Sequence, residues 1–124
     1  MNTLNSLVKR YLSQSDKKIL ITDSWNSFST TEFTKKVNYY KNLLVQNWSK
    51  KPQLKRGIAI HLDRGVEYLA IIFASWLANG YYLPLNMNSP KSIIDEQIRD
   101  SQVSLIAIIP VSYTHLTLPT IYSV

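Results

Sequence analysis

The chain has 124 residues, of which 45% are hydrophobic and 18% charged, and its formal net charge is +6. This composition excludes a disordered chain, which combines low hydrophobicity with high net charge, and the length predicts at most one domain. The sequence contains no cysteine, which excludes disulfides, thiolate metal sites and a cysteine nucleophile. The polar stretch after Met1 is unlike a secretory signal, so we expect a cytoplasmic protein.

The positive charge is unevenly distributed along the chain. Residues 1–56 carry eleven basic and three acidic side chains, whereas residues 57–124 carry three and five. The basic residues occur as spaced pairs, which is typical of a solvated surface, whereas RNA binding needs a clustered patch with exposed aromatic side chains. We therefore expect no nucleic-acid partner.

Two short elements are predicted before residue 28. Residues 4–12 place their apolar side chains on one face of a helix. Ile19–Thr22 is a β-like run, and the turn residues at 24–27 predict a small hairpin that ends near Phe28.

A longer helix is predicted from its amino-terminal signal. Ser29-Thr30-Thr31-Glu32 is a capping box, in which Ser29 and Glu32 each bind the backbone N–H of the other. Phe28 and Phe33 flank it as a hydrophobic staple. The helix is expected to run to about Trp48 with a regular apolar stripe on its core side. This stripe consists of Phe33, Val37, Tyr40 and Leu44.

A buried strand and a buried helix follow the basic loop 49–56. Residues 57–62 form a short apolar run that ends at Asp63, which we expect to cap the next helix. Residues 66–78 are apolar nearly all round, but their uncharged stretch is too short to cross a bilayer. Asn79-Gly80 is expected to end this helix, because both residues tolerate the left-handed conformation. We therefore expect a core helix and no membrane partner.

The remaining elements complete an alternating pattern. Residues 81–85 predict a strand, and Ser89 with Pro90 predicts the N-cap and first residue of a helix that ends at Ser101. Residues 103–109 predict another buried strand. After the hairpin, helices alternate with strands, which predicts an α/β fold with a mostly parallel sheet. The last helix is expected to bury Ile93, Ile94 and Ile98.

Very few residues suggest catalytic chemistry. The three glycines are too widely spaced for a dinucleotide fingerprint or a Walker loop. His61 and His115 are too isolated for a metal site, and we expect His61 to be a core histidine with satisfied hydrogen bonds. The sequence therefore assigns no catalytic, cofactor-binding or metal-binding residue. A solvated face is expected at Asp95, Glu96 and Asp100, and packing roles at Trp25, Trp48 and Trp76.

Three segments in unbroken order resemble the amino-terminal part of the adenylate-forming (AMP-dependent synthetase/ligase) superfamily. Residues 28–33, Phe-Ser-Thr-Thr-Glu-Phe, are similar to its early motif, apolar-Ser/Thr-x-x-Glu-Leu. Residues 77–86, Leu-Ala-Asn-Gly-Tyr-Tyr-Leu-Pro-Leu-Asn, are similar to its second motif, Leu-Lys-Ala-Gly-x-x-Tyr-Val-Pro-Leu-Asp. Ser89-Pro90 and residues 100–103 match the proline-started helix and the turn that follow. The resemblance covers roughly residues 17–109.

Three residues depart from these motifs, and the departures bear on the choice of subfamily and not on the superfamily. Asn79 stands where the family has glycine, Asn86 replaces the usual aspartate, and Met87 the usual proline. The spacing to Pro90 favours amino-acid-activating members, such as nonribosomal peptide synthetase adenylation domains, over fatty acyl-CoA synthetases.

The resemblance implies a ligase reaction for the parent protein. In this family a carboxylic or amino acid attacks the α-phosphate of ATP, with Mg²⁺ at the triphosphate, and the acyl group then passes to a thiol. Coenzyme A or the phosphopantetheine arm of a carrier protein supplies that thiol. The family's phosphate loop, ribose-binding acid, hinge and late lysine are not found in this sequence, so we expect a truncated fragment that is inactive as given. Its first partner would be the missing remainder of its own domain.

The last fourteen residues differ from the rest of the chain. Residues 111–124 contain no Lys, Arg, Asp or Glu, and residues 111–120 show neither helical nor strand periodicity. They resemble one reading frame of a transposase-type sequencing adapter, and the alternative is a genuine β-rich tail. We therefore predict a family fragment at 1–110 and an artefactual tail at 111–124. Two other hypotheses are a small self-contained α/β binding or interaction module, and a basic RNA-associated protein.

Overall fold

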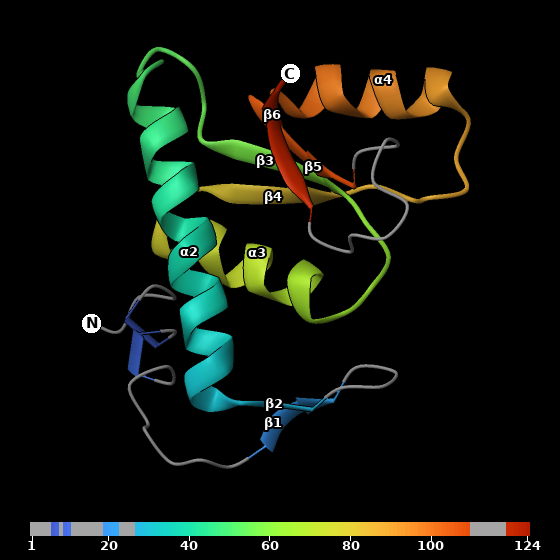
Figure 1. The fold of residues 1–124 in the computed structure, drawn as a ribbon. Helices are drawn as coiled ribbons and strands as arrows, with labels where there is room; N and C mark the ends of the chain where they lie inside the picture. Colours follow the sequence, from blue (N-terminus) through green and yellow to red (C-terminus); the bar gives the residue numbers. More distant parts are fainter. Residues whose placement is uncertain (1–5, 8, 11–18, 23–26, 110–118) are drawn as a thin grey trace.

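The computed structural model describes residues 6–7, 9–10, 19–22, 27–109 and 119–124 (Figure 1). Its elements in chain order are β1 (Ile19–Thr22), β2 (Ser27–Ser29), α2 (Thr30–Ser49), β3 (Gly57–His61), α3 (Val66–Leu77), β4 (Tyr81–Pro84), α4 (Lys91–Ser101), β5 (Leu105–Ile108) and β6 (Thr120–Ser123). β1 and β2 pair antiparallel, so the predicted hairpin is confirmed. Within the helix predicted over 4–12, the described residues are helical. Trp25 and His115 lie outside the described residues.

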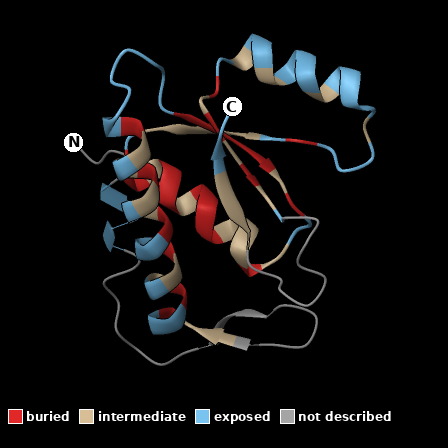
Figure 2. Cartoon of the chain, turned by 45° about the horizontal axis from the view of Figure 1, so that its top comes forward, coloured by how far each residue is buried: buried red, intermediate tan, exposed pale blue. Residues whose placement is uncertain are grey.

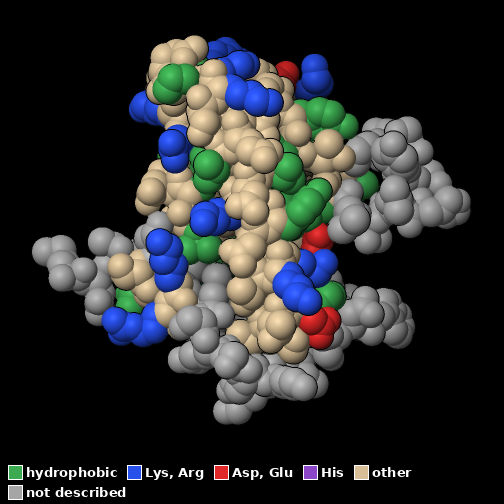
Figure 3. Space-filling view, turned by 60° about the vertical axis from the view of Figure 1, so that its left-hand side comes forward, with side chains coloured by type: hydrophobic (Ala, Val, Ile, Leu, Met, Phe, Trp, Pro, Cys, Tyr) green, Lys and Arg blue, Asp and Glu red, His purple; other side chains and the backbone are tan. Residues whose placement is uncertain are grey.

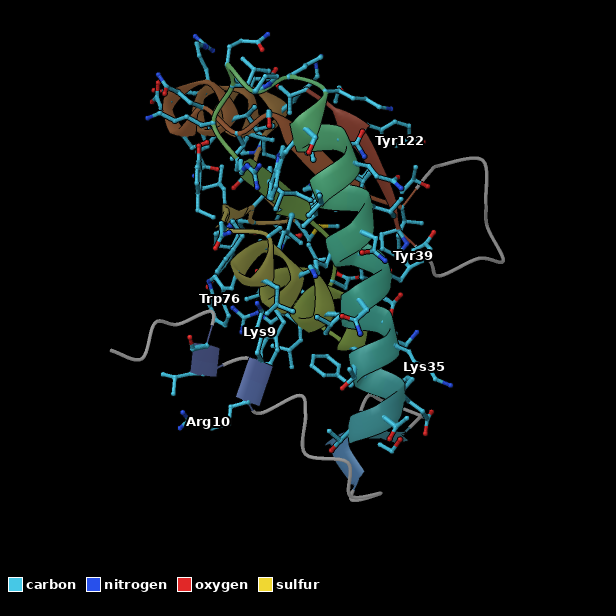
Figure 4. The ribbon with its side chains drawn as sticks, turned by 90° about the vertical axis from the view of Figure 1, so that its left-hand side faces the viewer. Lys9, Arg10, Lys35, Tyr39, Trp76 and Tyr122 are labelled. Carbon is cyan, nitrogen blue, oxygen red and sulfur yellow. The ribbon has the colours of Figure 1, made fainter. Side chains whose placement is uncertain are left out.

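α2 begins at the predicted capping box. The Glu32 backbone N–H donates to Ser29 Oγ (3.1 Å), and the Ser29 backbone N–H donates to Glu32 Oε1 (3.4 Å). Lys35 and Tyr39 lie on the outer side of this helix, away from the sheet (Figure 4). The whole predicted stripe is buried on the inner side, together with Trp48, which confirms it as core. These buried side chains are Phe33, Val37, Tyr40, Leu44 and Trp48.

The main sheet has four strands in the order β4-β3-β5-β6. β3 pairs in parallel with both β4 and β5, and β6 pairs antiparallel with β5. The predicted α/β fold with a mostly parallel sheet is therefore confirmed. Because β3, β4 and β5 run in the same direction, their carboxyl ends meet at one edge of the sheet (Figure 1).

α2 and α3 cover one face of the sheet and build the main core with it (Figure 2). Ile58 and Ile60 of β3 and Leu105 of β5 are buried against these two helices. Each buried hydrophobic side chain gains roughly 1.5–3 kcal/mol from its removal from water, so this face carries most of the stability.

α4 lies on the other face and is much less buried than predicted. Ile94 and Ile98 are half-buried against the sheet, whereas Ile93 is 42% exposed, so the prediction that all three are buried is wrong. α4 contacts the sheet through Ile94 and Ile98, which lie one turn apart. Ile93 points about 100° away from Ile94 and therefore lies to the side of this contact.

α3 begins later than predicted. Its first residue is Val66 and its N-cap is Gly65, with no side-chain capping bond. Asp63 is exposed three residues before the helix, so its prediction as the N-cap is wrong. The chain uses Asp63 and Arg64 to turn from β3 toward α3.

The end of α3 separates the roles of Asn79 and Gly80. Asn79 adopts the left-handed conformation with φ of 60°, as the sequence predicts. Gly80 is required for a different reason, since a Cβ there would lie 2.5 Å from both the Trp48 ring and the Arg56 carbonyl oxygen. Gly80 thus allows close packing between this turn and the end of α2.

β6 (Thr120–Ser123) falls within the segment 111–124 that is predicted to be an artefactual tail. Thr120–Ser123 pairs with Leu105–Ile108 of β5, and the Val124 backbone N–H donates to the Ser104 carbonyl (3.0 Å). Backbone hydrogen bonds require no side-chain pattern, and Ile121 adds a contact with the main core. The origin of residues 111–124 stays a prediction.

The surface agrees with the expected distribution of charge. On the face drawn in Figure 3, Lys and Arg side chains are scattered among other residues. Among the described helices, none has the length and apolar character needed to cross a membrane.

Candidate functional site

The connections after β3 and β4 leave the sheet on opposite faces. β3 leads into α3, which packs on the main core, and β4 leads into α4 on the other face. β3 and β4 are neighbours, and the segments that follow them diverge toward opposite faces (Figure 1). Such divergence after neighbouring parallel strands leaves a crevice outside their carboxyl ends. Open α/β sheets bind their ligands in such crevices, outside the carboxyl ends of the strands.

A pocket of about 420 Å³ occupies this position. Leu62 and Leu85, each 5% exposed, belong to the cores of the two opposite faces. The pocket therefore spans the edge of the sheet and not one side of it. Its lining consists of Leu62, Asp63, Arg64, Tyr68, Pro84, Leu85, Asn86 and Met87. We call this set the carboxyl-edge pocket.

Backbone and side-chain hydrogen bonds hold the β4 side of the pocket in place. The Leu85 backbone N–H donates to the Ile60 carbonyl (3.0 Å), which extends the β3–β4 pairing past Pro84. Asn86 Oδ1 accepts from the Asn88 N–H (2.9 Å), and the Asn86 carbonyl accepts from the Ser89 N–H (3.1 Å). These bonds form a turn at residues 86–89, which holds the β4 side of the pocket in place.

The lining chemistry suits binding better than catalysis. Asp63 and Arg64 supply one carboxylate and one guanidinium at the exposed rim, Asn86 an amide and Tyr68 a phenol. Among the described residues that line the pocket, none is a serine, threonine or cysteine. Within the described part of the chain, no group of three or more His, Cys, Asp and Glu side chains could hold a metal ion.

His61 lies beside this pocket but does not line it. It ends β3 and alternates with Ile60 and Leu62 of the main core, which places its side chain on the α4 face. Its Nε2 is buried without a hydrogen-bond partner in the described structure. The expectation of a core histidine with all its hydrogen bonds satisfied is therefore wrong for Nε2, because the flanking strands offer apolar side chains here.

The other residues singled out by the sequence are structural. Trp48 is buried in the main core, and the Trp76 ring packs 5.6 Å from Phe73 and 6.0 Å from Tyr82, measured between ring centroids. Asp95 pairs with Lys91 at 3.7 Å on the surface of α4. Its exposed neighbours on that helix form the solvated face that was predicted. They are Glu96 and Asp100.

A second pocket of about 500 Å³ lies at the opposite, amino-terminal edge of the sheet. Its basic residues, Lys51 and Lys55, belong to the exposed loop after α2. Lys51 lies near the carboxyl end of α2, where a positive charge stabilises the helix dipole. Its lining consists of Lys51, Gln53, Leu54, Lys55, Gln102, Val103, Ser104 and Val124.

The sequence reasoning did not identify the carboxyl-edge pocket. None of its polar residues belongs to a recognisable motif, and Asp63 was assigned to a helix cap. The available signal was topological, because polar residues at 63–64 and 86 directly follow two strands that were predicted to be parallel.

Comparisons with known proteins agree on one family. A family model for AMP-binding enzymes matches residues 8–121 of the chain. The dapdiamide synthesis protein DdaD of Enterobacter agglomerans is 30% identical over 105 residues, which make up 83% of this chain and 17% of DdaD.

Solved structures give the same picture. Apo MatB from Rhodopseudomonas palustris superposes with a TM-score of 0.69 at 27% identity, covering 86% of this chain and 21% of MatB. The Vibrio cholerae adenylation domain AlmE, in complex with glycyl-adenosine-5′-phosphate, has a TM-score of 0.65 at 20% identity over 86% of this chain and 19% of AlmE. At that identity the similarity concerns the fold alone. The chain spans about a fifth of the length of the relatives it matches.

Proposed function

The chain belongs to the AMP-binding enzyme family, and from this premise we propose that it is the amino-terminal part of an acid-activating, AMP-forming ligase. The observation that carries the proposal is the family match over residues 8–121. The similarity to MatB supports it, since another structure of that protein contains bound ATP. The alternative of a small self-contained binding module is not favoured, because no feature of the chain requires it.

The proposed reaction has two steps. A carboxylate oxygen of the substrate attacks the α-phosphorus of ATP, the bond to the β-phosphate oxygen breaks, and pyrophosphate leaves. The product is an acyl-adenylate. A thiol then attacks its carbonyl carbon, the bond to AMP breaks, and a thioester forms. Both steps develop negative charge on phosphate oxygens and need positive groups placed around them.

In this proposal the 124 residues contribute a binding surface to the larger enzyme. They do not supply the groups that act on ATP and on the acid. The carboxyl-edge pocket offers a single guanidinium, Arg64, which is too little positive charge for a triphosphate. The family's phosphate loop, ribose-binding acid and late lysine have no counterpart in the sequence. We therefore propose that the 124 residues are inactive alone, and that the pocket holds part of a substrate in the larger enzyme.

The substrate class and the acceptor extend the proposal. The spacing to Pro90 favours an amino acid over a fatty acid, and the similarity to a dapdiamide synthesis protein supports a biosynthetic ligase. Coenzyme A or a carrier-protein arm would supply the thiol. We propose a cytoplasmic location and no nucleic-acid partner. We also propose that residues 111–124 are foreign to the family domain, although the family match runs to residue 121.

Sequencing of the native locus with long reads, followed by expression of the extended gene, tests the proposal. The extended protein should catalyse ATP–pyrophosphate exchange that depends on an added carboxylic or amino acid, whereas the 124 residues should not. An extended protein with no exchange across a broad acid panel would contradict the proposed reaction. A native stop codon after Val124 would contradict the proposal that the chain is part of a longer enzyme.

A further inference from the structure

The turn that ends α3 contains an asparagine followed by a glycine. Asn79 is the one asparagine of the sequence that precedes a glycine, and it is exposed to solvent. The side-chain amide of an asparagine can be attacked by the backbone nitrogen of the next residue, and glycine hinders this attack least because it has no Cβ. The end of this core helix therefore carries a chemically labile pair of residues.

Deamidation of this pair is a ring closure within the chain. The Gly80 backbone nitrogen loses its proton and forms a bond to Asn79 Cγ, while the bond from Cγ to the side-chain nitrogen breaks and ammonia leaves. Water then opens the resulting succinimide ring at either of its two carbonyl groups. One product is an aspartate. The other is an isoaspartate, in which the backbone runs through the former side chain.

The folded turn holds the attacking nitrogen in a different place. The Gly80 N–H donates a 2.8 Å hydrogen bond to the carbonyl of Ser75, a fully buried residue, in a pattern typical of helix ends. The Asn79 N–H is also bound, 3.2 Å from the Trp76 carbonyl oxygen. The Gly80 nitrogen cannot lose its proton and attack while it makes this bond. Ring closure therefore requires the carboxyl end of α3 to open locally.

Arg56 fastens the same turn from outside the helix. Its Nη1 donates to the Ala78 carbonyl, 22 residues later in the chain, at 2.9 Å. Its own carbonyl accepts the Tyr81 N–H, also at 2.9 Å. These two bonds lie on either side of the labile pair, and Gly80 packs so closely against the Trp48 ring that a Cβ would have no room. The loop after α2 thus keeps the turn closed.

We propose that Asn79 is a deamidation site whose rate is set by the opening of the carboxyl end of α3, and that the Arg56 side chain holds this end closed. The inference does not depend on the proposed ligase reaction. Isoaspartate lengthens the backbone between Ala78 and Gly80 and displaces Gly80 from the Trp48 ring. Either product also adds a negative charge at the carboxyl end of a helix, where it opposes the helix dipole. A chain that has reacted therefore closes this turn less firmly.

Mass spectrometry of the aged 124-residue chain measures the reaction directly. The protein is kept at neutral pH with and without guanidinium chloride, sampled over time and digested with trypsin. The peptide that follows Arg64 and ends at Lys91 contains Asn79, Asn86 and Asn88, so the three asparagines are compared within one molecule. Asn79 should react at least about tenfold more slowly in the folded chain than in the denaturant. In the denaturant it should react fastest of the three.

Arg56→Met tests the side chain that closes the turn. The hydrogen bond to Ala78 is lost, so Asn79 should deamidate about threefold faster or more in the folded chain, with no change in the denaturant. Lys55→Met is the matched control, because it removes the same charge from the adjacent exposed residue. The contact of Lys55 with Ser104 is made by its backbone carbonyl and is retained. Lys55→Met should therefore react at the rate of the wild type.

Equal rates in the folded and the denatured wild type would overturn the proposal, because the fold would then give no protection. An unchanged rate in Arg56→Met, or an equal acceleration in Lys55→Met, would overturn the role of Arg56. If Arg56→Met does not fold, Arg56→Gln takes its place, with the same expected acceleration. The isoaspartate form, separated after ageing, should have a lower thermal midpoint than the unreacted protein, and an equal midpoint would show that the reaction does not weaken the turn.

Discussion

The Tyr40 hydroxyl donates a 2.5 Å hydrogen bond to Glu67 Oε1, and this bond joins α2 to the first turn of α3. Lys36 Nζ lies 3.0 Å from Glu67 Oε2, as an ion pair and not as an aligned hydrogen bond. The Glu67 carboxylate is only 16% exposed, so it depends on these two partners for charge compensation. The main core therefore includes one polar junction between its two helices.

Tyr40→Phe should destabilise the fold by about 1–2 kcal/mol, because it removes a hydrogen bond to a charged, mostly buried group. Urea unfolding followed by circular dichroism measures the change. Tyr39→Phe is the matched control, since Tyr39 is 61% exposed on the outer side of the same helix and should change stability little. Equal losses in the two variants would contradict this role of Tyr40.

The free energy of unfolding should also fall at alkaline pH, because the Tyr40 hydroxyl holds its proton more tightly in the folded state than in the unfolded state. Burial, and then the hydrogen bond to Glu67, raise the pKa of Tyr40 well above its ordinary value of 10.0. Below pH 10.0 both the folded and the unfolded state keep the Tyr40 proton, so the contribution of Tyr40 to the free energy of unfolding is constant. Above it the unfolded chain loses the proton first, so the free energy of unfolding falls as pH rises. The loss approaches about 1.4 kcal/mol per pH unit.

Urea unfolding of the wild type and of Tyr40→Phe on both sides of this pH checks the assignment. The wild type should lose stability more steeply than the variant, because only the wild type holds this proton in the folded state. Identical pH profiles for the two proteins would show that another group is responsible.

Gly80→Ala should cost about 1–3 kcal/mol, because the added methyl group overlaps the Trp48 ring and the Arg56 carbonyl. Asn79→Gly is the informative control. Residue 79 has the positive φ, and glycine adopts that conformation without a steric penalty, so this substitution should cost less than Gly80→Ala. Thermal unfolding of both variants measures the difference, and a larger loss at residue 79 would reverse the assignment of roles.

Local features of the fold could be predicted from the sequence. The capping box at Ser29 acts within four residues, and the stripe from Phe33 to Leu44 follows from helical periodicity, so both were identified. The alternation of helices and strands gave the parallel sheet because such connections have few solutions. Family membership was also accessible, since its motifs lie in these same local segments.

Features that depend on distant segments could not be predicted. The role of Gly80 requires Trp48, which lies more than thirty residues earlier, and the exposure of Ile93 depends on where α4 touches the sheet. The carboxyl-edge pocket exists only after β3 and β4 are neighbours. Asp63 was misassigned because a residue that follows a strand and precedes a helix can serve either the turn or the cap.

Asn86 stands where the family motif has aspartate, and its hydrogen bond in the turn 86–89 allows this departure to be tested. Asn86 accepts the Asn88 N–H through Oδ1, and an aspartate side chain can accept the same bond. Asn86→Asp should therefore preserve stability, whereas Asn86→Ala should lose about 0.5–1.5 kcal/mol with that hydrogen bond. Urea unfolding measures both. A loss of similar size in the two variants would show that the side-chain amide, and not its acceptor oxygen, holds the turn.

Met87→Pro tests the other departure at the same turn. The Asn86 carbonyl accepts the Ser89 N–H, which makes Met87 the second residue of a four-residue turn, a position that favours proline. Proline there restricts the unfolded chain, so the variant should be more stable by about 0.4–1 kcal/mol. Met87→Ala controls for the loss of the side chain and should not stabilise. A destabilised Met87→Pro would mean that the backbone at residue 87 does not adopt the φ that proline requires.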